Sequence, residues 1–106
     1  MQCILYNINM NKLEFEWDDE KEKKNIRDHG IDFSTAAHVF ADEYRIEKFD
    51  GKHSDGEDRY KVIGRINGYL TIVVVSYTMR KNDAVIRMIS ARKAEKHERK
   101  EYNGYY

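Results

Sequence analysis

Seven consecutive residues, His53 to Arg59, place an imidazole, carboxylates and a guanidinium side by side. These types suit acid–base chemistry on a phosphate, with His53 or Glu57 transferring a proton while Arg59 binds the anion. A metal ion held by His53, Asp55 and Glu57 is a second interpretation, although the spacing matches neither an EF-hand nor a zinc motif. The third is a solvated turn, in which Gly56 supplies unusual backbone angles and Asp55 a local hydrogen bond.

Charge is distributed unevenly along the 106 residues, although the formal net charge is zero. Residues 1–58 carry 8 basic and 15 acidic side chains, whereas residues 59–106 carry 11 and 4. The arginines of the second part are Arg59, Arg65, Arg80, Arg87, Arg92 and Arg99. Such asymmetry is typical of a protein with a polyanionic partner, and the planar guanidinium binds phosphate through two hydrogen bonds. Salt bridges between the two parts explain the same asymmetry.

Composition excludes several classes of protein. Cys3 is the only cysteine, so neither an intramolecular disulfide nor a cysteine-ligated zinc site is possible. The longest apolar run, Ile72 to Val75, is far too short to span a membrane, and the first residues lack a basic leader followed by an apolar segment. We therefore expect a soluble cytoplasmic protein with one small core.

The elements that must position these side chains begin with a strand over residues 13–17, where apolar and acidic residues alternate. A charged helix is predicted over 18–29 and ends at Gly30. Asp32 is suited to cap a second helix. The apolar residues of that helix, spaced to form one buried stripe, are Phe33, Ala36, Ala37 and Phe40.

Strands dominate the rest of the chain. Residues 44–49 alternate, and two longer runs, Tyr60 to Ile66 and Tyr69 to Thr78, flank the dipeptide Asn67-Gly68, which favours a two-residue type I′ turn. That turn places Ile66 opposite Tyr69. A further strand over 84–91 and a last helix over 93–102 follow.

These elements predict an α+β domain over residues 13–102. Its two N-terminal helices pack on an antiparallel meander of about four to five strands, and the third helix ends the domain. Residues 1–12 show no clear periodicity and are an N-terminal extension, an edge strand or the product of an early start site.

The predicted register separates the candidate side chains by face. Arg59 and Arg65 share one face but lie roughly 20 Å apart. Arg87 and Arg92 point to opposite faces, since an odd separation turns the side chain over. The tyrosines of the other face either stack on bases or pack in the core; they are Tyr60, Tyr69 and Tyr77.

A series of short motifs runs through the chain in a fixed order. They are Phe15-Glu16-Trp17-Asp18, Asn25-Ile26, His29-Gly30-Ile31, Phe33, Ala36-Ala37, Val39-Phe40, His53-Ser54-Asp55-Gly56-Glu57-Asp58-Arg59, Ile63-Gly64-Arg65, Ile89-Ser90-Ala91-Arg92-Lys93-Ala94, Glu98-Arg99 and Tyr102. In order and spacing this series resembles the BrnT family of bacterial toxins, over about residues 13–102.

The resemblance implies a ribonuclease toxin of a type II toxin–antitoxin pair with a RelE-like fold. It further implies neutralisation by a cognate BrnA antitoxin whose DNA-binding part represses the operon, in a complex of two toxins with two antitoxins. No metal and no cofactor are expected in this family.

RNA cleavage without a metal needs a group that takes the 2′-OH proton, a cation that stabilises the phosphorane, and a proton donor for the leaving oxygen. The candidates for the cationic clamp are Arg59, Arg65, Arg80 and Arg92. Of these, Arg59 and Arg92 match the family motifs. The acid–base candidates are Glu57 and His53, with Tyr77 as a lesser one. Arg59 and Arg92 can cooperate only if the sheet curls or the strand ends there.

A non-catalytic toxin-like module that binds an antitoxin partner is the alternative from another functional class, and a plain structural domain is a third interpretation. A sequence pI near 6.9 predicts weak binding to free RNA, which makes ribosome-associated RNA a further candidate substrate.

Overall fold

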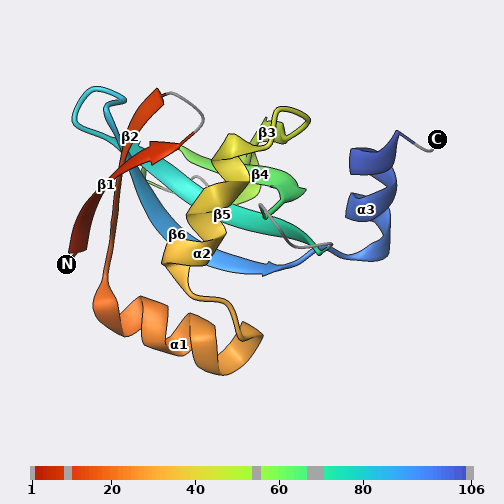
Figure 1. Ribbon diagram of the computed structural model, residues 1–106, viewed down its shortest axis with the longest axis horizontal. Coiled ribbons are helices and arrows are strands. Elements are labelled where there is room, and N and C mark those ends of the chain that lie inside the picture. Colours follow the sequence, from red (N-terminus) through yellow and green to blue (C-terminus); the bar gives the residue numbers. More distant parts are fainter. Residues whose placement is uncertain (1, 9–10, 54–55, 67–70, 105–106) are drawn as a thin grey trace.

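A computed structural model describes residues 2–8, 11–53, 56–66 and 71–104. Within these residues a six-stranded sheet has helices on both faces (Figure 1). The strands are β1 (Gln2–Ile8), β2 (Asn11–Trp17), β3 (Ile46–Phe49), β4 (Arg59–Arg65), β5 (Ile72–Arg80) and β6 (Val85–Lys93). The helices are α1 (Asp19–His29), α2 (Phe33–Ala36) with the 3₁₀ turn η1 (Ala37–Ala41), the 3₁₀ turn η2 (Gly51–His53), and α3 (Lys96–Asn103).

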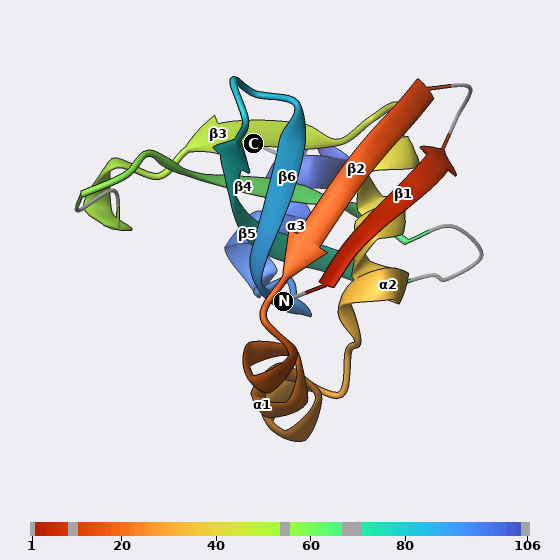
Figure 2. The ribbon, with the colours of Figure 1, turned by 90° about the vertical axis from the view of Figure 1, so that its left-hand side faces the viewer.

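The α+β class is confirmed, and so is the antiparallel meander for β3, β4, β5 and β6, but the prediction that the whole sheet is antiparallel is wrong. The strand order is β1-β2-β6-β5-β4-β3, and β2 runs parallel to β6, with Glu14 opposite Val85 (Figure 2). The sheet is therefore mixed, with β1 and β3 at its edges. Pairing between β2 and β6 joins residues about 70 positions apart, and the alternation within either strand carries no information about its partner. The RelE-like fold stays a prediction.

The hairpin between β4 and β5 exists, but its predicted register is wrong by two residues. Arg65 lies opposite Ile72, whereas the predicted turn places Ile63 there. Residues 67–70, which include the predicted Asn67-Gly68 turn, lie outside the described part of the chain. Because the shift is even, each side chain stays on its predicted face.

The prediction that Arg87 and Arg92 point to opposite faces is also wrong. Between them β6 contains an extra residue, Ile89, which forms a β-bulge against β5. The two arginines pair with Thr78 and Val74, which are four residues apart on one strand and so share a face. The bulge thus brings both guanidinium groups to the same side of the sheet.

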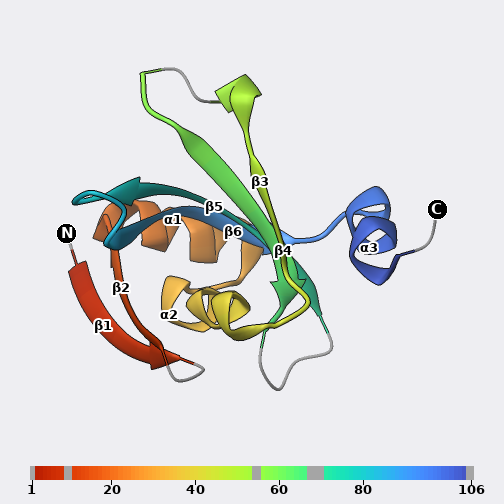
Figure 3. The ribbon, with the colours of Figure 1, turned by 90° about the horizontal axis from the view of Figure 1, so that it is seen from above.

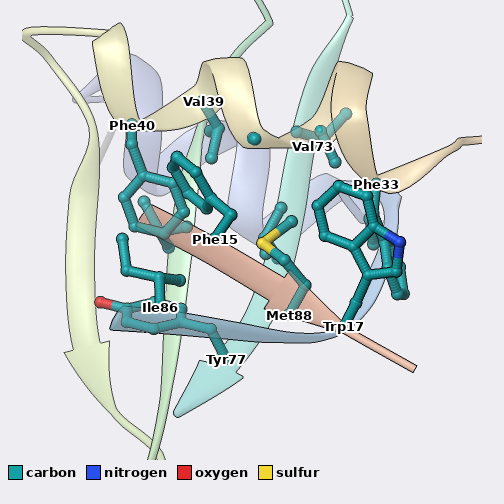
Figure 4. Packing of buried hydrophobic residues seen from close by; sticks show 14 of the residues in the cluster. Phe15, Trp17, Phe33, Val39, Phe40, Val73, Tyr77, Ile86 and Met88 are labelled. Carbon is teal, nitrogen blue, oxygen red and sulfur yellow. The ribbon is translucent and has the colours of Figure 1, made fainter. Parts of the chain in front are cut away.

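The main core lies on the face that we call the covered face, because α2 and η1 pack over it. Fully buried side chains of the sheet interlock there with the helical stripe (Figure 4). From the sheet come Phe15, Trp17, Val62, Val73, Val75 and Met88, and from α2 and η1 come Phe33, Ala36, Ala37, Val39 and Phe40. The ring of Phe40 meets Tyr77 edge-on, with centroids 5.1 Å apart.

Helix ends follow the expected capping chemistry. The Asp18 carboxylate accepts hydrogen bonds from two backbone N–H groups at the start of α1, and Gly30 ends the helix with a φ of 72°. Asp32 caps α2 in the same way. Buried Asn25 fixes α1 to β6, since its amide both donates to and accepts from the backbone of Ala91 at 2.9 Å.

On the opposite face, which we call the open face, a smaller apolar cluster lies under α3. It contains Ile63, Ile72, Val74 and Ala94, with Ile46 and Tyr102 packed against them. The Tyr102 hydroxyl donates to Asp42 at 2.5 Å, and Glu101 forms an ion pair with Lys48. Helix α3 covers only this end of the open face (Figure 3). No helix among the described residues has the length and apolar character that a membrane crossing requires.

Candidate functional site

The uncovered end of the open face contains a hollow of about 210 Å³, which we call the cationic hollow. Its lining comes from the turn after β3 and from strands β4, β5 and β6: Asp50, His53, Arg59, Lys61, Ser76, Ile89, Ser90 and Arg92. Three basic side chains and one imidazole therefore converge on one concavity, as anion binding requires.

Strand register explains why these side chains meet. Lys61 lies opposite Ser76, and Ser76 lies opposite Ser90, so the three form one row across β4, β5 and β6. Arg59 begins β4 on the same face, two residues before Lys61. The bulge at Ile89 adds Arg92, the next-to-last residue of β6, so that Arg59 and Arg92 line one hollow.

Two hydrogen bonds anchor the start of β4 beside the hollow. The Asp50 backbone N–H donates to the Arg59 carbonyl at 2.7 Å, which closes the segment that carries His53. The buried Thr78 hydroxyl donates to the Asp58 carbonyl at 2.6 Å. The loop that connects β3 to β4 therefore has a defined position at both of its ends.

His53 and Asp50 form a hydrogen-bonded pair on this loop, with 2.9 Å between Nδ1 and Oδ2. Burial raises the pKa of Asp50, but the hydrogen bond to His53 and the nearby charges of Lys61 and His53 outweigh burial, so the net pKa is lowered. Asp50 is thus a carboxylate that accepts from Nδ1–H. In the neutral imidazole this leaves the basic lone pair on Nε2, the arrangement of a general base with an orienting acid.

Arg92 contributes to the hollow in a different way, because Glu98 of α3 binds its guanidinium at both terminal nitrogens. The two hydrogen bonds measure 2.8 and 2.9 Å. These bonds outweigh burial and raise the pKa of Arg92, and they lower the pKa of Glu98 to about 2. The fork that would hold a phosphate with two bonds is already engaged by a carboxylate.

Two predicted residues lie together outside the hollow. Arg80 at the end of β5 forms an ion pair with Glu57, with 3.0 Å between Nη2 and Oε2. The chain turns sharply after β5, where Lys81, Asn82 and Asp83 all have positive φ values. Neither Arg80 nor Glu57 lines the concavity that holds His53. Asp55, the third ligand of the conceivable metal site, lies outside the described residues.

Arg65 and Tyr77 are also placed away from the hollow. Arg65 occupies the far end of β4, where its guanidinium carbon lies 5.7 Å from the centre of the Tyr102 ring. Tyr77 is buried on the covered face, and its hydroxyl donates to Glu47 at 2.8 Å. Burial and the Glu47 carboxylate raise the pKa of Tyr77, which makes this phenol a poor proton donor.

Sequence reasoning missed five lining residues: Asp50, Lys61, Ser76, Ile89 and Ser90. Lys61 was open to prediction, because its separation of two residues from Arg59 puts both on one face of a strand. Asp50 lies three residues before His53, a spacing that a 3₁₀ turn brings into contact. A separation of two residues also places Ser90 on one face with Arg92, but the bulge at Ile89 decides which face of the sheet they share with Arg87.

Within the described ranges, no three side chains of His, Cys, Asp or Glu type are grouped so that they could hold a metal ion. The side chains of the hollow offer proton transfer at His53 and stabilisation of negative charge by Arg59, Lys61 and Arg92.

Comparison with known families identifies the family to which the chain is similar. A family model described as a ribonuclease toxin, BrnT, of a type II toxin–antitoxin system matches residues 17–98. The matched stretch contains every residue of the cationic hollow and Glu98. No curated protein matches the chain.

Proposed function

The chain belongs to the BrnT family of ribonuclease toxins of type II toxin–antitoxin systems, and we propose from this premise that it is a metal-independent endoribonuclease with its active site in the cationic hollow. The observation that supports the assignment is the convergence of His53, oriented by Asp50, with Arg59 and Lys61 in one concavity.

In this proposal the 2′-oxygen of the RNA attacks the adjacent phosphorus while His53 Nε2 accepts the 2′-OH proton. Arg59 and Lys61 stabilise the charge that accumulates on the phosphorane oxygens, since preorganised cations act most strongly where charge develops. The bond from phosphorus to the 5′-oxygen then breaks, and the leaving oxygen takes a proton from the imidazolium or from Lys61. The products are a 2′,3′-cyclic phosphate and a 5′-hydroxyl.

Arg92 adds positive charge at the rim of the hollow while Glu98 fixes its position. We assign it electrostatic stabilisation rather than two-point phosphate binding, because its terminal nitrogens are bonded to Glu98. The other sequence candidates, Arg65, Arg80, Glu57 and Tyr77, lie outside the hollow and are not part of the proposed site.

Cleavage of a defined RNA by purified variants, in the presence of a chelator, tests the proposal. We expect wild-type protein to remain active, His53→Ala to lose about 10²- to 10⁴-fold in rate and Arg59→Ala about 10²- to 10³-fold. Arg80→Ala is the matched control, because it removes a guanidinium that lies outside the hollow. Full cleavage by both His53→Ala and Arg59→Ala would overturn the assignment.

Membership of a type II system implies a protein antitoxin and an RNA target. We propose a BrnA-type antitoxin in a complex of two toxins with two antitoxins, and RNA cleavage that arrests translation and growth. Inducible expression of the chain, with and without the small gene beside its own, tests this. Growth arrest that the neighbouring gene relieves is expected, and unimpaired growth contradicts the proposal.

A non-catalytic toxin-like module is the second candidate, and the engagement of Arg92 by Glu98 favours it. A protein that binds the neighbouring gene product but leaves RNA intact under all conditions would establish this alternative. The same cleavage assay therefore decides between the two.

A further inference from the structure

A ladder of aromatic rings leads from the core to the surface near the outer edge of the sheet. Phe40 meets Tyr77 in the core, Tyr77 stacks on Tyr60 with centroids 5.6 Å apart and an interplanar angle of 27°, and Phe49 meets Tyr60 edge-on at 5.7 Å. Phe49 ends the ladder and is 58% exposed. The ladder thus presents an aromatic ring to solvent on a rigid support.

Three of these rings, those of Phe49, Tyr60 and Tyr77, line a groove of about 500 Å³, which we call the aromatic groove. Its residues are Glu47, Lys48, Phe49, Tyr60, Tyr77, Met79 and Asp83. Apart from Lys48, the charged groups that line it are carboxylates, and one of them, Glu47, already accepts the Tyr77 hydroxyl. A flat, uncharged ring therefore suits this groove better than a phosphate group.

The aromatic groove is continuous with the cationic hollow around β3. Lys48 and Phe49 also line a middle hollow of about 230 Å³, which shares Asp50 and Lys61 with the cationic hollow. Figure 3 shows that β3 and β4 extend away from the rest of the sheet, with β3 outermost. A chain that passes around this edge meets the three concavities in sequence.

We propose that single-stranded RNA bound in the cationic hollow continues around β3 and stacks a base on Phe49. This inference extends the proposed function by adding a site for a base. It depends on the proposed function for the position of the scissile phosphate. Single-stranded RNA combines flat bases with a phosphate backbone, which matches a path that has aromatic rings at one end and basic groups at the other. Stacking on an aromatic ring is tolerant of base identity, so the groove contributes affinity more than sequence preference.

Charge along the middle of the path is nearly balanced. Lys48 is paired with Glu101, and Lys61 lies 3.9 Å from Asp50. Stacking rather than phosphate neutralisation therefore supplies the affinity at this end. Since counterion release makes phosphate contacts depend on salt, the contribution of Phe49 is expected to be nearly independent of salt concentration.

The test measures binding of a fluorescent RNA of about ten nucleotides in which every 2′-oxygen is methylated, so that the attacking group of the proposed reaction is blocked. We expect Phe49→Ala to weaken binding about 5- to 150-fold and Phe49→Trp to retain it. Phe49→Leu keeps an apolar side chain without a ring and is expected to behave like Phe49→Ala. Tyr44→Ala is the matched control, because Tyr44 is 72% exposed but lines none of the three concavities.

The readouts separate this inference from the proposed function. If wild-type protein cleaves no RNA but binds the methylated RNA in a Phe49-dependent way, the function fails and the inference stands. In an active enzyme, Phe49→Ala should raise KM for the unmethylated RNA and leave kcat unchanged.

Three results overturn the inference: no binding by wild-type protein, equal binding by wild-type protein and Phe49→Ala, and equal weakening by Tyr44→Ala. If Phe49→Ala keeps RNA binding but loses the neighbouring gene product, the groove is a protein-binding surface, which also overturns it. Circular dichroism of each variant excludes a folding defect, and Phe49→Leu decides the matter if Phe49→Ala does not fold.

Discussion

The two faces of one sheet differ in how far their side chains are exposed to water. On the covered face, side chains such as Phe15 and Met88 are fully buried beneath α2 and η1. On the open face, the same sheet carries Arg59, Lys61 and Arg92 around a solvent-accessible hollow. Because alternate residues of a strand point to opposite faces, one set can supply stability while the other is charged at little cost.

The open face has two regions, and the contact between Arg92 and Glu98 lies at the boundary between them. Toward α3 the cluster of Ile63, Ile72 and Val74 is apolar and buried. Toward the turn after β3 the surface is basic. Substitutions on each face, ordered by their expected effect on the free energy of unfolding, test this division.

Phe15→Ala on the covered face should have the largest effect, a loss of about 3–5 kcal/mol, since it leaves a cavity among fully buried side chains. Urea unfolding followed by the fluorescence of Trp17, the only tryptophan, measures it. A loss below about 1 kcal/mol would mean that this face is not the main source of stability.

Glu98→Gln at the boundary should cost up to about 3 kcal/mol near neutral pH, and it should do so in a pH-dependent way. Hydrogen bonds from Arg92 outweigh burial and lower the pKa of Glu98 to about 2, from an ordinary value of 4.5. The wild-type contribution is therefore complete above the ordinary pKa and is lost as the pH falls toward the folded-state pKa.

The unfolding free energies of wild-type protein and Glu98→Gln, compared at about pH 6 and about pH 3, give the measurement. The gap between the two proteins should narrow at the lower pH. Asp32, Asp42 and Asp50, whose pKa values are also lowered, are present in both proteins and cancel in the comparison. A gap that stays constant with pH would contradict the assignment of the shift to this pair.

Tyr77→Phe should cost about 1 kcal/mol, because it removes one hydrogen bond to Glu47 and keeps the buried ring. Glu47 keeps its ion pair with Arg45, at 3.2 Å, so the carboxylate is not left isolated. The kcat of RNA cleavage should be unchanged, because Tyr77 lies on the face opposite the cationic hollow and the substitution keeps the ring that lines the aromatic groove. A fall in kcat without a change in stability would restore Tyr77 as a catalytic candidate.

Local signals in the sequence were sufficient to place the helices and to assign the faces of β4 and β5, but not those of β6. The acidic cap and Gly30 bounded α1, and the apolar stripe after Asp32 predicted the helical segment that covers the core. The parallel pairing of β2 with β6 was missed, because it depends on contacts between distant segments. The bulge at Ile89 was missed because no turn residue marks it.

The sequence predicted a site residue only where its role could be inferred from the strand or loop that contains it. His53 and Arg59 were singled out, whereas Asp50 was not, because its contact with His53 depends on the 3₁₀ turn between them. The engagement of Arg92 by Glu98 depends on where α3 begins after β6. Spacing along the chain could not show that this arginine is already paired.

Lys61→Ala should have the smallest effect on stability, within about 0.5 kcal/mol, because the ion pair that its partly exposed ammonium makes with Asp50 is long, at 3.9 Å. If the open face is a catalytic surface, the same substitution should lower RNA cleavage at least about tenfold, since it removes a charge from the hollow. Lys52→Ala is the matched control: Lys52 is exposed on the adjacent turn, outside the lining of the hollow, and should affect neither quantity. If Lys61→Ala destabilises the protein as much as Phe15→Ala does, stability does not come mainly from the covered face. If it cleaves RNA as fast as wild-type protein, the charge of Lys61 on the open face does not contribute to catalysis.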